Sequence, residues 1–370
     1  MNSIARLVLS LSLFTFLLSA SAQFASAGDW LVKTVAGTGQ SDNNGNSGQT
    51  TNTNISQPFG VEVGPDGMLY FTEVGNHRVW KLNRKTGKMT VVAGSGKKGY
   101  SGDGGSALKA DLNEPYEVRF DATGNMYFVE MQNHLVRKID KQTGKISTVA
   151  GTGKPGFGGD GGPATKAQFK VPHSIAIDGR GFLYIADIGN HRIRKVNLKT
   201  GKISTLVGNG KKNFPSDGDR AAGSPIPGPR ALSISGRTLW IVLREGNGVW
   251  KMNLDDEILH HVAGTGKSGY TGDGGPAINA TFAGPKGIAV GPHGNVFVVD
   301  SENNAIRRIN IKTKTVETIA GTGGGRGYAG DGGDANKAKF AQPHGICVDN
   351  KGGVYIGDTR NHRIRQITFK

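Results

Sequence analysis

Short stretches of alternating apolar and polar residues make up most of this chain, and Gly, Asn or Asp residues separate them. The block that begins at Val171 shows the pattern clearly: "HSIAID", "FLYIAD", "HRIRKVN" and "ISTLVG" follow one another, separated by "GRG", "IGN" and "LKTGK". Short runs rich in β-branched and aromatic residues, bounded by turn residues, predict β-strands. We therefore expect four antiparallel strands in this block, which we call a to d.

Five further blocks repeat the same order of apolar runs and turns. The six copies begin at Gln57, Glu114, Val171, Gly228, Gly284 and Gln342, so successive copies are 57, 57, 57, 56 and 58 residues apart. A four-stranded unit repeated at a fixed period is typical of the blades of a β-propeller. We predict an all-β fold, a six-bladed β-propeller with four antiparallel strands per blade.

The two ends of the chain complement each other. The sixth copy ends at Lys370 after strand c, whereas "WLVKTVAGTG" from Trp30 matches the strand d sequence "GKISTVAGTG" from Gly144. Pairing the N-terminal strand with the C-terminal blade would leave no open sheet edge between the termini. We predict that Trp30–Val35 lies alongside Arg363–Thr368 and closes the ring.

Residues 1–27 have the composition of a secretory signal peptide. Arg6 precedes the apolar stretch "LVLSLSLFTFLLSA", and small-residue cleavage sites follow at 20–22 and 25–27. We predict a secreted or periplasmic protein whose propeller occupies residues 28–370, with no transmembrane span in the mature chain. An uncleaved membrane anchor is the alternative.

Composition adds three constraints. The 59 Gly residues suit a fold with many turns, and the formal net charge of +16 bears on partners rather than on fold. The only cysteine, Cys347, cannot form an internal disulfide and lies in the apolar run "HGICVD", where a buried small hydrophobic residue is expected. A monomer is the expected state.

The junctions between strands b and c carry a recognisable motif. The segments "ADIGNHRIRKV", "TRNHRIRQI", "EVGNHRVWKL" and "QNHLVRKI" resemble the NHL repeat, and the resemblance covers nearly all of residues 28–370. It implies a six-bladed propeller similar to bacterial extracytoplasmic NHL proteins and to the SMP-30/gluconolactonase-like and TolB-like propellers. It implies no single activity, because propellers of this kind host both enzymes and binding proteins.

Residues that recur in nearly every blade are expected to hold the blades together. One set is a carboxylate in the d-to-a loops, which could cap a short helical turn; the alternative is a ring of cation sites. A second set is the motif histidine with the acidic residue that ends strand b. The members are Asp103, Asp160, Asp273, Asp331 and, approximately, Asp217 in the loops; His77, His134, His191 and His362, with Asn304; and Glu73, Glu130, Asp187, Asp300 and Asp358.

Positions that differ between matched blades are better candidates for function. The residues that open strand a should surround one mouth of the axial channel, on the face of the d-to-a loops. Large, polar and unequal side chains there indicate a mostly cationic ligand-binding pocket, and unremarkable solvent-facing residues are the alternative. The candidates are Tyr116, Glu117, His173, Arg230, Lys286 and His344.

A metal site is the second interpretation of the same ring. "VPHSIAI" and "QPHGICV" resemble the strands that carry zinc-ligand histidines in peptidylglycine amidating lyase, which implies His173 and His344 as ligands. That lyase has three such histidines on alternate blades, whereas this chain has two on opposite blades. A lactonase-like divalent metal site would rely on Glu117. We therefore expect no cofactor, with a divalent metal as the alternative.

The expected function is recognition rather than catalysis. No P-loop, dinucleotide fingerprint, zinc-protease motif or nucleophile elbow is present. A basic propeller suits a partner such as a protein, a glycan or another anionic polymer of the cell envelope, and no cytoplasmic nucleic acid is expected. The alternative is a metal-dependent lyase or a lactonase-like hydrolase at the channel mouth.

Overall fold

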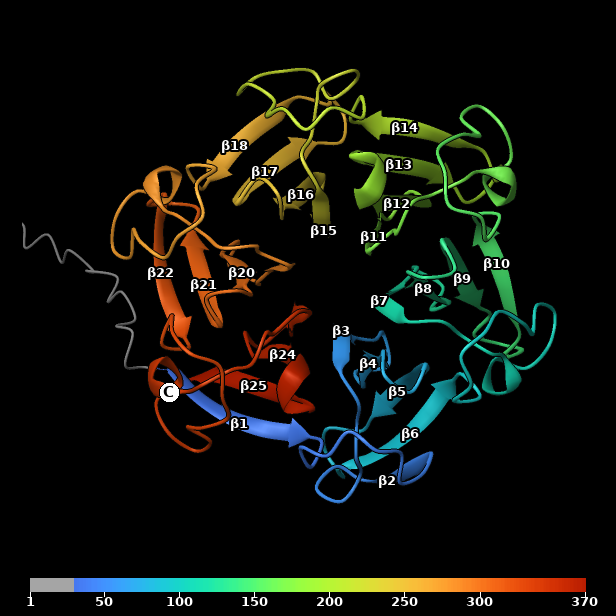
Figure 1. Cartoon of the computed structure of the whole chain (residues 1–370), viewed down its shortest axis with the longest axis horizontal. Coiled ribbons are helices and arrows are strands. Elements are labelled where there is room, and N and C mark those ends of the chain that lie inside the picture. The colour runs from blue at the N-terminus through green and yellow to red at the C-terminus, as the bar shows by residue number, and fades with distance from the viewer. Residues whose placement is uncertain (1–29) are drawn as a thin grey trace, which may run out of the picture.

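A computed structural model describes residues 30–370 and contains six β-sheets arranged as blades around a central axis (Figure 1). In every blade, strand a is innermost and the following strands lie progressively further out (Figure 1). The six-bladed propeller predicted from the repeat period is confirmed. The proposed signal peptide lies outside the described residues. No helix within residues 30–370 is long and apolar enough to cross a membrane.

The first three blades have these strands. Blade 1 contains β3 (Pro58–Val63), β4 (Leu69–Glu73), β5 (Arg78–Leu82) and β6 (Lys88–Ala93), with β2 (Ser47–Gln49) added outside β6. Blade 2 contains β7 (Pro115–Phe120), β8 (Met126–Glu130), β9 (Leu135–Ile139) and β10 (Ile146–Ala150). Blade 3 contains β11 (Ser174–Ile177), β12 (Phe182–Asp187), β13 (Arg192–Asn197) and β14 (Ile203–Val207).

The remaining blades complete the circle. Blade 4 contains β15 (Pro229–Ser235), β16 (Thr238–Leu243), β17 (Gly248–Asn253) and β18 (Leu259–Ala263). Blade 5 contains β19 (Gly287–Val290), β20 (Val296–Asp300), β21 (Ala305–Asn310) and β22 (Thr315–Ala320). Blade 6 contains β23 (Ile346–Val348), β24 (Val354–Asp358), β25 (Arg363–Phe369) and β1 (Trp30–Ala36). Short 3-10 turns occur at Ala107–Lys109, Ala164–Lys166, Ile188–Asn190, Ala277–Asn279, Ala335–Lys337 and Thr359–Asn361.

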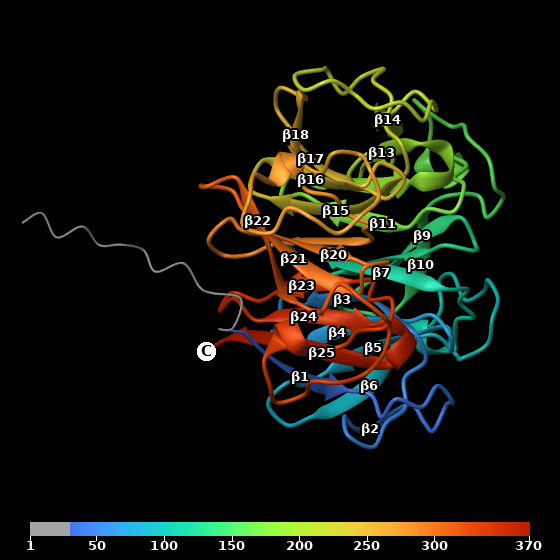
Figure 2. The same cartoon turned by 60° about the vertical axis from the view of Figure 1, so that its left-hand side comes forward.

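Blade 6 is closed by the N-terminal strand. β1 pairs antiparallel with β25, from Trp30 opposite Phe369 to Ala36 opposite Ile364. The first and last described strands lie side by side in both views (Figures 1 and 2). The predicted pairing is therefore confirmed, and both ends of the propeller belong to one sheet.

Blade 1 differs from the prediction of four strands. The loop that precedes it lacks the Gly-Asp-Gly-Gly sequence of the other loops and instead places β2 against β6, with Ser47 opposite Thr90. Thr50 N–H also donates to the carbonyl of Gly87 in the c-to-d hairpin (2.9 Å). A fifth, short strand therefore covers the outer edge of this blade, which would otherwise expose unpaired backbone groups.

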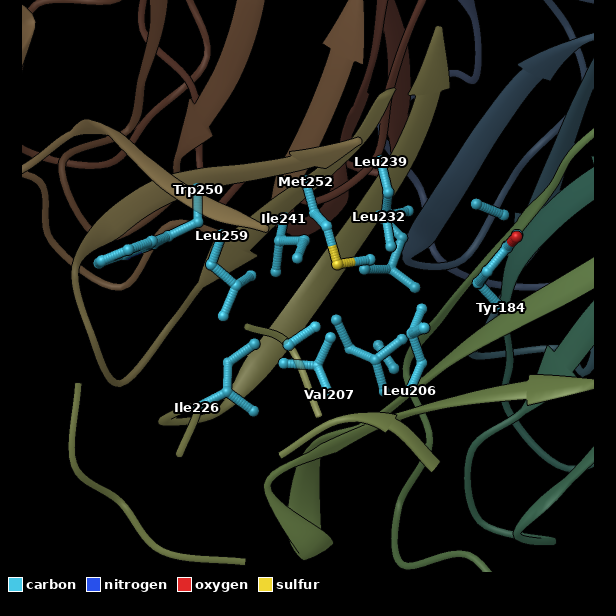
Figure 3. Close-up of a cluster of buried hydrophobic side chains, with 14 of the residues drawn as sticks. Tyr184, Leu206, Val207, Ile226, Leu232, Leu239, Ile241, Trp250, Met252 and Leu259 are labelled. Carbon is cyan, nitrogen blue, oxygen red and sulfur yellow. The ribbon is translucent and has the colours of Figure 1, made fainter. Parts of the chain in front are cut away.

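Apolar side chains from adjacent blades interlock and form the core. Between blades 3 and 4, Leu206 and Val207 meet Leu232, Ile241 and other residues of the facing sheet (Figure 3). Tyr184, Ile226, Leu239, Trp250, Met252 and Leu259 complete the labelled cluster (Figure 3). Burial of each such side chain contributes about 1.5–3 kcal/mol, so contacts between sheets stabilise a fold that has no disulfide.

One side chain from each blade also contacts the next blade, and we call this contact the interblade clip. In blade 2, the N–H of Val171 donates to Nδ1 of His134 (3.1 Å), and in blade 5 the N–H of Gln342 donates to Oδ1 of Asn304 (2.8 Å). The clip residues adopt positive φ angles, which Asn and His tolerate better than most residues. They are His77, His134, His191, Asn247, Asn304 and His362. The motif histidines therefore connect blades.

A buried arginine of strand c fastens the d-to-a loop in four blades, and we call this contact the loop latch. In blade 3, Arg194 pairs with Asp160 of the loop (2.6 Å) and with the buried Asp187 at the end of strand b (3.7 Å). Asp160 also accepts a hydrogen bond from the Thr205 hydroxyl (2.7 Å). The latch arginines are Arg137, Arg194, Arg307 and Arg365, paired with Asp103, Asp160, Asp273 and Asp331. The repeated carboxylates thus have structural partners.

The expected helix cap is wrong in its detail. The 3-10 turn at Ala164–Lys166 follows Pro163, and no side chain caps it. Asp160 lies three residues before that proline, and its carboxylate is occupied by Arg194 and Thr205. A charged partner on strand c competes successfully with the backbone N–H groups of a three-residue turn.

Blade 4 replaces the latch with aromatic packing. Leu243 and Trp250 occupy the positions of the buried acid and the latch arginine, and Trp250 stacks on His261 with ring centroids 4.6 Å apart. Asp217 keeps part of the pattern, because it accepts a hydrogen bond from the N–H of His261 (2.7 Å). A groove of about 220 Å³ lies beside Trp250 and Phe214, at the position that the loop latch occupies in other blades.

Candidate functional site

The six predicted ligand-binding residues lie together at the axis. Each opens or precedes an innermost strand, so the ring geometry brings one or two residues per blade to a single small cavity. That cavity is about 10 Å³ in volume, close to the room that one water molecule needs. Its lining consists of Phe59, Gly60, Tyr116, Glu117, His173, Arg230, Lys286, His344 and Gly345.

Aromatic rings fill most of this mouth. The ring of Phe59 stacks on His344 with centroids 4.0 Å apart and lies 4.3 Å from the ring of Tyr116. Tyr116 in turn meets His173 edge-on at 5.0 Å. Four side chains from blades 6, 1, 2 and 3 therefore form a continuous arc, and a ligand on this face would rest on the ring rather than enter the channel.

Phe59 was absent from the predicted set, although it occupies the equivalent position in blade 1. The sequence signal for it was its place in the repeat, and its apolar character argued against a polar pocket. The structure shows that its ring is the element that links His344 to Tyr116.

The cations of the ring differ in their partners. Lys286 Nζ donates to Oε1 of Glu302 (2.6 Å), whereas the guanidinium of Arg230 makes no hydrogen bond or ion pair within residues 30–370 and is only attracted by the more distant carboxylate of Glu117. Arg230 is only 4% exposed, and its guanidinium lies 5.6 Å from the centre of the Tyr116 ring. Burial lowers the pKa of Arg230 to about 10 and the pKa of Lys286 to about 8. Both therefore remain mostly protonated at pH 7.

The two histidines are held as neutral acceptors. Nδ1 of His173 lies 2.6 Å from the carbonyl oxygen of Val171, and Nδ1 of His344 lies 2.9 Å from that of Gln342. A proton on Nδ1 satisfies these contacts and leaves Nε2 with a free lone pair. Burial, together with the nearby charges of Arg230 and Lys286, holds both pKa values well below the usual 6.5.

The residues proposed for a metal site do not form a ligand cluster. Phe59 and Tyr116 separate His344 from His173 around the arc. Glu117 is already paired, because its carboxylate accepts a hydrogen bond from Nη1 of Arg119 (2.8 Å). Within the part of the chain that the structure describes, no three His, Cys, Asp or Glu side chains are grouped so that they could hold a metal ion.

A much larger cavity lies in the same axis at the opposite face. It is about 490 Å³ in volume and is lined by the last residues of the innermost strands and by the a-to-b turns. Arg119 separates it from the aromatic ring, because this side chain lines the cavity while it pairs with Glu117 of the ring. The sequence reasoning missed this site. The signal was available, because residues 62, 119, 176, 233, 289 and 347 also differ between matched blades.

Comparisons with known proteins agree with the architecture. Residues 282–309 and 340–367 match the NHL repeat family, and residues 153–222 match the Teneurin NHL domain. NHL repeat-containing protein 2 of Homo sapiens is 29% identical over 340 residues, which cover 82% of this chain and 45% of the human protein. The chain therefore spans less than half the length of this relative.

Solved structures share the fold at low sequence identity. An auxiliary nutrient binding protein from Bacteroides thetaiotaomicron has a TM-score of 0.68 and 17% identity, covering 92% of this chain and 77% of that one. A gluconolactonase from Xanthomonas campestris has a TM-score of 0.54 and 12% identity, covering 86% and 87%. At these identities the likeness concerns the fold alone.

Proposed function

We propose that this six-bladed β-propeller, which matches the NHL repeat family over residues 282–309 and 340–367, is a secreted or periplasmic binding module for an anionic group. The group would belong to a protein, a glycan or another polymer of the cell envelope. It would rest on the channel mouth at the face of the d-to-a loops, in contact with Arg230.

The observation that carries the proposal is the unpaired guanidinium of Arg230. A buried charge without a partner is costly, and native proteins normally pair such a charge or use it. Arg230 is buried among Tyr116, His173 and Lys286 at the ring, and no carboxylate of residues 30–370 contacts it. An incoming carboxylate, sulfate or phosphate would supply the missing partner, and a guanidinium can hold such a group through two parallel hydrogen bonds.

The surroundings of Arg230 favour an anion. The exposed Arg244 is close enough that its charge helps to lower the pKa of Lys286 and of His173. Three cationic side chains therefore converge on the mouth. Of the nearby carboxylates, Glu302 pairs with Lys286, and Glu117, which attracts Arg230 from a distance, is itself paired with Arg119. A structural neighbour described as an auxiliary nutrient binding protein is an example of this fold in a binding role.

Binding of two anionic polymers to the purified protein tests the proposal. Polygalacturonate and dextran sulfate serve as carboxylate and sulfate probes, and neutral dextran serves as the reference. We expect Arg230→Gln to weaken binding of at least one anionic probe about tenfold or more, because a charge-assisted hydrogen bond contributes about 1.5–3 kcal/mol.

Lys199→Gln is the matched control. Lys199 is exposed in a c-to-d hairpin on the opposite face, so this variant loses the same charge without touching the ring. Equal losses for the two variants would show that binding follows the general basic charge and would overturn the assignment to Arg230. Stoichiometric zinc or calcium that is lost on His173→Ala would instead favour the lyase or lactonase alternative.

A further inference from the structure

The large axial cavity has an apolar collar. The last apolar residue of each innermost strand lines it, and together they form a ring at the face of the a-to-b turns. The collar consists of Val63, Phe120, Ile177, Ile234, Val290 and Val348. The volume of the cavity, about 490 Å³, falls within the usual range of about 300–1,000 Å³ for small-molecule pockets.

One residue deeper, the six blades differ sharply. Four of them contribute small side chains, namely Ala176, Ser233, Ala289 and Cys347, whereas adjacent blades 1 and 2 contribute Glu62 and Arg119. The space in the cavity results from the four small residues. The two charged residues make the cavity polar on one side only, so it offers both an apolar wall and a single polar anchor.

The polar anchor has an unbalanced negative charge. Nη1 of Arg119 lies 3.2 Å from Oε2 of Glu62 and 2.8 Å from Oε1 of Glu117, so one guanidinium serves two carboxylates. Arg119 also donates to the carbonyls of Val118 (2.7 Å) and Leu232 (3.4 Å). Apart from its ion pair with Arg119, the Glu62 carboxylate makes no side-chain hydrogen bond within residues 30–370, and 28% of the Glu62 side-chain surface remains accessible.

The rim reinforces this charge. Asp121 and Asp178 belong to the a-to-b turns that line the entrance, and Arg119 is the only basic residue in the lining. Asp178 has Arg180 at 3.5 Å, but Asp121 is held by neutral groups, among them Asn125 and Tyr127. A protein with a formal charge of +16 thus carries a locally acidic cavity, which favours a cationic ligand.

We propose that this cavity binds a small amphipathic amine. The ammonium group would pair with the free carboxylate oxygen of Glu62, and the apolar body would pack against the collar. This site lies at the opposite end of the channel from Arg230 and does not depend on anion binding there.

The protonation of Glu62 gives the proposal a pH signature. Burial, together with the charge of Glu117 and despite Arg119, raises the pKa of Glu62 to about 7. The other titratable groups around it are Asp121, Asp178 and Cys347, and burial raises the pKa of the Cys347 thiol well above its ordinary value. Affinity for an amine should therefore increase between pH 6 and pH 8, as Glu62 loses its proton.

Cys347 provides a direct readout of occupancy, because it lines the cavity and is the only cysteine of the chain. Its rate of modification by methyl methanethiosulfonate at pH 8 is measured with phenethylamine, 2-phenylethanol or phenylacetate present, and calorimetry gives the affinities. We expect phenethylamine to bind about tenfold more tightly than the other two, as one charge-assisted contact allows, and to protect Cys347 at the lowest concentration.

Four variants locate the effect. Glu62→Gln should remove the preference for the amine over the alcohol and the pH dependence, while Glu317→Gln, which removes a carboxylate paired with Arg308 on outer strands, should change neither. Ala289→Leu should fill the cavity and weaken all three probes; Ser233→Leu tests the same point if Ala289→Leu does not fold. Equal affinity for the three probes, no protection of Cys347, or unchanged amine binding in Glu62→Gln would each overturn the proposal.

Discussion

At the scale of single residues, the loop latch shows how a buried charge is kept in this fold. The side chains of Arg194 and Asp187 are both fully buried, and Asp160 at the surface completes the group. Desolvation raises the pKa of Asp187 to about 6 even with these partners. Arg194 therefore offsets part of the cost of burying the charge of Asp187. The pair stabilises the blade only while both residues are present.

Arg194→Met should destabilise the protein by about 3–5 kcal/mol, because Asp187 would lose its charged partner while it remains buried. The double variant Asp187→Leu with Arg194→Trp copies the Leu243 and Trp250 pair of blade 4. It should lose less stability than the single variant Arg194→Met. Urea denaturation checks the order of the two midpoints.

Arg308→Met is the control for this comparison, since Arg308 pairs with a partly exposed glutamate on outer strands. An ion pair that stays partly open to solvent contributes less than one that is fully buried, so this variant should lose clearly less stability than Arg194→Met. A loss in Arg194→Met no larger than that in Arg308→Met would contradict the role assigned to the latch.

At the scale of elements, the interblade clip joins the b-to-c turn of one sheet to the segment that leads into strand a of the next. The histidine version needs a neutral ring, because Nδ1 accepts a hydrogen bond from a backbone N–H. Burial lowers the pKa of His134 below 6.5, which means that the folded state resists protonation more than the unfolded chain does. The stability that this clip contributes is complete above pH 6.5 and is lost as pH falls through the lower pKa of the folded state.

His134→Asn should retain the clip and remove its part of the acid sensitivity, because Asn247 and Asn304 already serve as clips in blades 4 and 5. Thermal unfolding at pH 7 and pH 5 measures the effect. We expect a smaller drop in midpoint for the variant than for the wild-type protein. The exposed His293 is the control, and an equal change in His293→Asn would argue against the clip as the source.

At the scale of the whole molecule, closure depends on one strand that lies far from its partner in sequence. Val32 of β1 is 1% exposed and packs in a core cluster with Ile367 of β25 and residues of blade 5. The same strand therefore completes blade 6 and contributes to the contact between blades 5 and 6. Loss of this packing should open the ring at one place, which we call the seam: the contact of β1 with β25 and with blade 5.

Val32→Asp should destabilise the protein by about 3 kcal/mol or more, since it buries an unpaired carboxylate in that cluster. Lys33→Asp changes the neighbouring exposed side chain and should have a much smaller effect. Hydrogen exchange of β25 amides provides the test, with faster exchange expected only for Val32→Asp. Unchanged protection in both variants would contradict the proposed importance of the seam.

Prediction from sequence succeeded where the signal was local and failed where side chains from several blades share one space. Tyr116, His173, Arg230 and His344 line one small cavity, as their shared position in the repeat indicates, and their role in ligand binding stays a prediction. The aromatic seal through Phe59 was not foreseen, since it depends on the distance between rings of different blades. The large cavity was missed although the residues at this level differ between matched blades, because four of them are small and a small side chain does not by itself indicate a ligand.

The sequence by itself determined the strand order, the number of blades and the pairing of the two ends, because alternation and repeat spacing are written along the chain. Only the tertiary structure decided which end of the axis is filled and which is open. That outcome depends on the combined volumes of six unequal side chains at each level of the channel, where Phe59 closes one face and Ala176, Ser233 and Ala289 leave space at the other. The combined volume of these side chains is a property of the assembled ring and cannot be obtained from any single repeat.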